Sequence, residues 1–138
     1  MKRVLIDTNI VLDVLLNRKD FLEDSTAVIK LLVKQKFRGF VAATTLTNVY
    51  YIVCRATRNT DDAVTAVDKI LQWCEVAPVN RRVLVAARVA GMPDFEDAVQ
   101  VVAAQDFGID IVVTRDKTGF SNSGLLVYSP EEFLETLQ

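Results

Sequence analysis

The sequence predicts an α/β fold in which helices cover both faces of a parallel β-sheet. Short apolar runs alternate along the chain with longer stretches of helical periodicity, a pattern typical of strand–helix–strand units. Two of these runs, residues 4–6 and 111–113, contain only Val, Leu and Ile, as buried strands of a parallel sheet do. The 138 residues fit a single domain, 1–138, that is long enough to bury a core.

The first part of the chain predicts one strand and two helices. Residues 2–6 form the strand, and a helix begins near Thr8 and carries the apolar stretch 10–16. After a polar loop, Ser25 is a candidate N-cap for a second helix, which ends near Lys36.

The middle of the chain predicts a second strand and a pair of helices. Residues 39–42 form a weaker strand, and 46–58 form a helix, although Tyr50–Val53 alone would suit a strand. Thr60 is expected to cap another helix, and 75–79 form a short strand or an extended connector. Because helices outnumber strands, we expect two of them to form an αα-hairpin inserted between strands.

The last part of the chain predicts three helices and two strands. Helices are expected at 80–90 and at 95–108, where apolar residues recur at helical spacing. Strands are expected at 110–113 and 125–127. A final helix begins in residues 129–132, Ser-Pro-Glu-Glu, which combine a cap, a proline and a glutamate at favourable positions.

Composition excludes several kinds of chemistry. The chain contains no histidine, which removes the Ser-His-Asp arrangement and the usual general base. Its two cysteines, Cys54 and Cys74, are too few and too far apart for a disulfide framework or a zinc site. The ligands that remain are oxygen atoms, which suit Mg²⁺ or Mn²⁺.

Net charge and hydropathy limit where the protein is expected in the cell and which partners it can bind. A net charge of −2, from 16 basic and 18 acidic residues, excludes a bulk electrostatic binder of nucleic acid but is compatible with a local basic patch. No apolar stretch is long enough to span a bilayer, and the N-terminus lacks the features of a signal peptide. We therefore expect a cytoplasmic protein with no membrane partner.

Two acids are expected at one edge of the sheet. Asp7 and Asp116 follow the two most apolar strands, and ligand sites in open α/β sheets lie at the carboxyl ends of strands. Alone, Asp7 could be a helix cap and Asp116 a turn residue. Because like charges at one edge repel unless a cation lies between them, the pair predicts a divalent-metal site and phosphate chemistry.

A second group of acids lies just before the alanine-rich helix. Asp94 stands where an N-cap would, so we interpret it as a cap. We interpret Glu96 as a solvent-facing acid and Asp97 as a metal ligand. Asp94 and Asp97 are three residues apart and can share a helix face.

Three further charged residues carry weaker signals. Asp13, on the first helix, is interpreted as a solvent-facing or capping residue. Arg115 and Lys117 flank Asp116 and are either plain surface charges or contacts to a phosphate backbone beside the metal.

Three motifs together resemble the PIN-domain family. They are residues 5–9 (Leu-Ile-Asp-Thr-Asn), 94–98 (Asp-Phe-Glu-Asp-Ala) and 112–116 (Val-Val-Thr-Arg-Asp). Their order and separations match the family over essentially the whole chain, and the most similar members are small bacterial ones, such as the toxins of VapBC-type toxin–antitoxin pairs. The resemblance implies a three-layer α/β/α sandwich with a central parallel sheet, and a metal-dependent ribonuclease activity.

The resemblance also implies roles for single residues. The expected metal-binding and catalytic residues are Asp7, Asp97 and Asp116, and the expected supporting residues are Asn9, Asn48, Asp94 and Thr114. The sequence departs from the family at Asn48, where the family has a glutamate as its second acid. Asparagine keeps a carbonyl oxygen but removes one negative charge, which should weaken metal binding.

Two functions follow from this pattern. The first is an Mg²⁺- or Mn²⁺-dependent endoribonuclease that acts on RNA as the toxin of a toxin–antitoxin pair, with an antitoxin partner and a homodimeric state. The alternative is a catalytically weakened PIN-like module that binds RNA or a protein without cleavage. Phosphoryl transfer to aspartate is disfavoured, because Asn9 stands where a haloacid-dehalogenase-like phosphatase needs a second aspartate. The acidic pair of a response-regulator receiver is also absent after the first strand.

Overall fold

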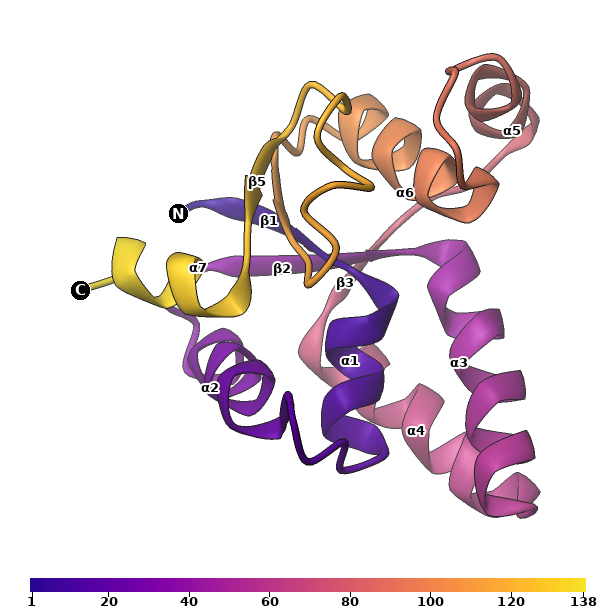
Figure 1. The fold of residues 1–138 in the computed structure, drawn as a ribbon. Coiled ribbons are helices and arrows are strands. Elements are labelled where there is room, and N and C mark those ends of the chain that lie inside the picture. Colours follow the sequence, from indigo (N-terminus) through magenta and orange to yellow (C-terminus); the bar gives the residue numbers. More distant parts are fainter.

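A five-stranded, all-parallel sheet in the order β3-β2-β1-β4-β5 forms the centre of the molecule (Figure 1). The computed structural model describes residues 1–138. The strands are β1 (Arg3–Ile6), β2 (Arg38–Ala42), β3 (Glu75–Ala77), β4 (Ile111–Val113) and β5 (Leu126–Tyr128). The central strand β1 pairs directly with β4, with Ile6 opposite Val113. The segments that lead to Asp7 and Asp116 are therefore neighbours, as the sequence predicts.

Seven helices cover the sheet on both faces, which confirms the three-layer α/β/α arrangement (Figure 1). The helices are α1 (Thr8–Leu15), α2 (Leu22–Val33), α3 (Ala43–Thr57), α4 (Thr60–Trp73), α5 (Arg81–Arg88), α6 (Phe95–Asp106) and α7 (Pro130–Thr136). Helices α5 and α6 lie on one side of the sheet and the other five on the opposite side. The expected αα-hairpin is formed by α3 and α4, which pack against each other and follow β2 and precede β3 along the chain. None of the helices combines the length and apolar character that a membrane span needs.

The central strand has no face turned to solvent, which explains its purely apolar sequence. Val4 and Ile6 belong to the core beneath α1–α4 and α7, whereas Leu5 belongs to the core beneath α5 and α6. All three side chains are fully buried. Burying each contributes about 1.5–3 kcal/mol relative to leaving it exposed, so both layers of helices anchor the strand that carries Asp7.

Helix starts account for most differences from the sequence-based prediction. Helix α2 begins at Leu22, so Ser25 lies inside it and is not its N-cap. The cap of α4 is Asn59, whose side chain accepts from two backbone N–H groups, and not Thr60. The helix expected from residue 46 begins at Ala43 instead. The predicted capping box at Ser129 is confirmed.

Candidate active site

Asp7 lies at the carboxyl end of the central strand, where two side chains hold its carboxylate. Thr114 Oγ1 donates to Asp7 Oδ2 at 2.8 Å, and Gln100 Nε2 donates to Asp7 Oδ1 at 3.1 Å. Asp7 occupies the N-cap position of α1, but its carboxylate makes no capping hydrogen bond, so the capping interpretation does not hold. The residue is only 4% exposed. Burial raises the pKa of Asp7 above its ordinary value, and the hydrogen bonds from Thr114 and Gln100 partly oppose that rise.

Thr114 connects the two strand-end aspartates. Its fully buried hydroxyl donates to Asp7 and accepts from the backbone N–H of Asp116 at 2.9 Å. One hydroxyl therefore fixes both the side chain of one acid and the backbone of the other. Asp116 Oδ1 in turn accepts from the N–H of Gly119 at 2.9 Å, so Asp116 is also the turn residue that its sequence suggests.

The first turn of α6 brings more acids to the same edge. Asp94 is the N-cap, as predicted, because its Oδ1 accepts from the N–H of Asp97 at 2.8 Å. Partial burial raises the pKa of Asp97 to about 7, and repulsion from neighbouring carboxylates adds to the rise. The repelling acids are Asp94, Asp7, Asp116 and Glu96. Five carboxyl groups from three segments of the chain are thus close enough to interact.

The interpretation of Glu96 as a solvent-facing acid agrees with its exposed side chain, but this acid also has polar and acidic neighbours in the site. Its side chain is exposed, yet partial burial raises the pKa of its carboxyl group, while hydrogen bonding from Thr8 and Asn48 lowers it. Repulsion from Asp94 and Asp7 raises the pKa further. Glu96 therefore faces the cluster of acids as well as the solvent.

Sequence reasoning missed Gln100. It is fully buried on α6, where it is the one polar residue in the stretch 98–104, and that isolation within an apolar helix face was the available signal. Its Nε2 donates a hydrogen bond to Asp7, but its Oε1 has no hydrogen-bond partner. A buried amide with an unpaired oxygen costs stability, which is typical of a residue retained for a site.

Two other polar residues near the site have local contacts. The hydroxyl groups of Thr8 and Thr45 are 2.8 Å apart and join the start of α1 to the first turn of α3. Asn9 is exposed, and its Oδ1 accepts from Arg18 at 3.1 Å. Thr8 and Thr45 therefore fix the spacing of the two helices that border the acids, whereas Asn9 points its amide oxygen to the arginine.

Asp13 is fully buried, so its interpretation as a solvent-facing or capping residue is wrong. Arg115 donates from Nε and from Nη2 to the two oxygens of Asp13 at 2.8 and 3.0 Å, and Ser25 Oγ donates to the carboxylate at 2.9 Å. The Arg115 guanidinium also lies 3.6 Å from the ring centre of Phe21. Arg115 is thus neither a free surface charge nor free to meet a phosphate.

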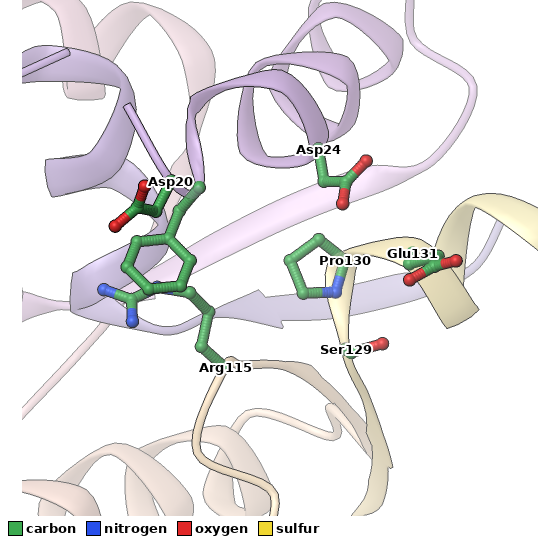
Figure 2. Close-up of a pocket in the computed structure, with 7 residues that line it drawn as sticks. Asp20, Asp24, Arg115, Ser129, Pro130 and Glu131 are labelled. Atoms are coloured by element: carbon green, nitrogen blue, oxygen red, sulfur yellow. The ribbon is translucent and has the colours of Figure 1, made fainter. Parts of the chain in front are cut away.

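Figure 2 shows Arg115 extending from the loop after β4 toward Asp20, beside a pocket of about 190 Å³ that Asp24 and Pro130 also line. The side chain crosses from the loop to the start of α2. Because Asp116 follows Arg115 directly, this crossing fixes the loop that carries one of the expected ligands.

The donor chemistry at the sheet edge fits a hard divalent cation. The available groups are carboxylate and amide oxygens, including the unpaired Oε1 of Gln100. No three acidic side chains are arranged to hold one ion as they stand. Both oxygens of Asp7 already accept hydrogen bonds, and Asp116 Oδ1 accepts from Gly119. Each of these oxygens keeps a second lone pair for a cation, so the hydrogen bonds orient the carboxylates and do not block binding.

The fold agrees with the comparison to known families. The chain belongs to the PIN domain family, whose model matches residues 3–118. Along nearly its full length it is also similar to Ribonuclease VapC1 of Aquifex aeolicus, with 24% identity over 139 aligned positions that cover 97% of this chain and 94% of the relative.

Solved structures show the same fold at low sequence identity. A chain of the DNA-bound VapBC complex of Salmonella typhimurium aligns with a TM-score of 0.71 and 17% identity, covering 94% of this chain and 99% of that one. VapC20 of Mycobacterium tuberculosis, a toxin that cleaves the sarcin-ricin loop, aligns with a TM-score of 0.70 and 15% identity, covering 89% and 96%. These likenesses establish the architecture.

Proposed function

We propose that this chain is a divalent-metal-dependent ribonuclease with Asp7, Asp97 and Asp116 as its metal-binding and catalytic carboxylates. The observation that carries the proposal is the crowding of acids around Asp97, which helps to raise its pKa to about 7. Holding uncompensated carboxylates together is unfavourable, and a bound cation removes the repulsion. The similarity to Ribonuclease VapC1 supports RNA as the substrate.

The residues at this site would have different roles in binding the cation. Thr114 and Gln100 donate to opposite oxygens of Asp7 and set the orientation of its carboxylate. Because the pKa of Asp97 lies near neutrality, its carboxyl group is partly protonated at pH 7, and the proton leaves when a cation binds. When bound, Mg²⁺ or Mn²⁺ supplies Lewis-acid chemistry to a water molecule and to the phosphate, which suits a chain without histidine.

RNA cleavage in the presence of Mn²⁺ tests this proposal. The wild-type chain should cleave single-stranded RNA, and EDTA or the substitution Asp7→Asn should abolish cleavage. Asp110→Asn is a matched control, because Asp110 is an exposed aspartate at the opposite end of β4. Cleavage that survives both EDTA and Asp7→Asn would refute the proposal.

We also propose that the chain acts as the toxin of a toxin–antitoxin pair and forms a homodimer. Support for the toxin role comes from its structural neighbours, which include VapBC complexes and a toxin–antitoxin complex from Klebsiella pneumoniae. Expression of the chain alone should arrest the growth of a bacterial host, and Asp7→Asn should relieve the arrest. Light scattering after size-exclusion chromatography measures the oligomeric state, and a monomer at micromolar concentration would contradict the dimer.

A second candidate function is a weakened PIN-like module that binds RNA or a protein without cleavage. Asn48 favours it, because the site has lost the charge of the family's second acid, and no three acids stand ready to hold one ion. The substitution Asn48→Glu distinguishes the candidates. A large gain in Mn²⁺ affinity and in cleavage would support the weakened module.

A further inference from the structure

Asn48 occupies the position of the family's second acid, and an acidic residue of another helix lies beside it. Asn48 lies on α3, and Glu96 lies in the first turn of α6. Both side chains line the same shallow pocket of about 230 Å³. The two helices therefore meet at the position where the family's glutamate would stand.

Glu96 is next to both Asn48 and an expected ligand: it lines the pocket with Asn48, and it directly precedes Asp97 in the first turn of α6. The Thr8 hydroxyl and the Asn48 amide lower the pKa of its carboxyl group, whereas Asp94 and Asp7 raise it, so these four residues are within electrostatic reach of Glu96. Glu96 also interacts directly with Asp97, so it is part of the same charge cluster as the expected ligands.

We propose that Glu96 supplies the carboxylate that Asn48 lacks and is itself a metal-binding residue of the site. This inference rests on the proposed function, because it assumes the cation site at Asp7 and Asp97. The acid has moved from α3 to α6, and the site keeps four carboxylates. Their residues are Asp7, Glu96, Asp97 and Asp116.

In this arrangement Asn48 orients the carboxylate of Glu96. Its side-chain N–H can donate to the Glu96 carboxylate and orient it, whereas a glutamate at position 48 would repel it. Hydrogen-bonding partners that orient a metal ligand typically change affinity by about 10–100-fold when they are removed. The asparagine is therefore a partner of the acid in this chain and not a sign of a lost site.

Titration calorimetry of the full-length chain with Mn²⁺ alone tests the inference. Glu96→Gln should weaken Mn²⁺ binding by about tenfold or more, because it removes one anionic ligand. Asn48→Glu should restore binding in the Glu96→Gln background but give little gain in the wild-type chain, where it adds a fifth crowded acid. A large gain in the wild-type background, or no rescue in the variant, would overturn the inference.

Glu131→Gln is the matched control, since Glu131 is an exposed glutamate at the same position in the first turn of α7 as Glu96 in α6. It should leave Mn²⁺ affinity unchanged, and melting curves should show that all variants fold. Asp7→Asn separates the two proposals. If Asp7→Asn abolishes binding while Glu96→Gln matches the control, the inference about Glu96 fails and the proposed function stands. If neither weakens binding, both fail.

Discussion

Replacing Arg115 with alanine should strongly destabilise the fold, because it removes the main partner of a buried carboxylate. Asp13 is fully buried and receives two hydrogen bonds from Arg115, at 2.8 and 3.0 Å. After the substitution, only Ser25 at 2.9 Å and Arg18 at 3.5 Å would remain near the charge.

The size of the loss follows from these contacts. Breaking a buried ion pair by removing one partner costs about 3–5 kcal/mol. The remaining donors, Ser25 and Arg18, place the loss near the lower end of that range, and the lost stacking on Phe21 adds about 0.5–1 kcal/mol. Asp13→Asn should cost less, about 1–3 kcal/mol, because the Arg115 side chain is 26% exposed and water can reach it.

Urea denaturation followed by circular dichroism measures this loss as a shift in the midpoint at constant slope. Lys117→Ala is the control, because Lys117 lies on the same loop but pairs with Glu132 at the exposed surface. We expect no measurable loss for Lys117→Ala. The reasoning would be refuted if Arg115→Ala destabilised the chain no more than this control.

Three further predictions concern the acids at the sheet edge. Thr114→Val keeps the side-chain shape but removes the donor to Asp7 and the acceptor for the Asp116 N–H. It should lower the free energy of unfolding by about 1–3 kcal/mol in urea denaturation and weaken Mn²⁺ binding in calorimetry. Gln100→Leu removes the second donor to Asp7 and should weaken Mn²⁺ binding by about tenfold or more, and unchanged affinity would exclude an orienting role. Because the pKa of Asp97 rises from 3.8 to about 7 on folding, its stabilising contribution is present below pH 3.8 and is lost as the pH rises through about 7. Without metal, the chain should therefore melt at a lower temperature at about pH 8 than at about pH 5, and Mn²⁺ should reverse this at the higher pH.

The positions of Asp7 and Asp116 could be predicted because they depend on a strong and local signal. A strand buried on both faces is apolar throughout, and parallel strands present their carboxyl ends at one edge. The cap at Asp94 was predictable for the same reason, since the cap and the N–H that donates to it lie within one turn. These features need no knowledge of which distant residues meet.

The pairs that the sequence did not reveal all join distant parts of the chain. Asp13 and Arg115 are 102 positions apart, and nothing in the first helix shows that an arginine side chain from a distant loop will reach Asp13. Ser25 has the chemistry of an N-cap but uses its hydroxyl on Asp13, so the local signal was misleading. Glu96 stands at an exposed helix start, and only the packing of α6 beside α3 brings it to Asn48.

The central claim is that acids at the carboxyl edge of β1 and β4 bind the catalytic cation. A crystal structure of the wild-type chain grown with Mn²⁺, with the ions located by anomalous scattering, tests this claim most directly. We predict Mn²⁺ at this edge with oxygens of Asp7, Asp97 and Asp116 among its ligands. An edge without Mn²⁺ at saturating concentration, or an ion bound only by other residues, would contradict the claim.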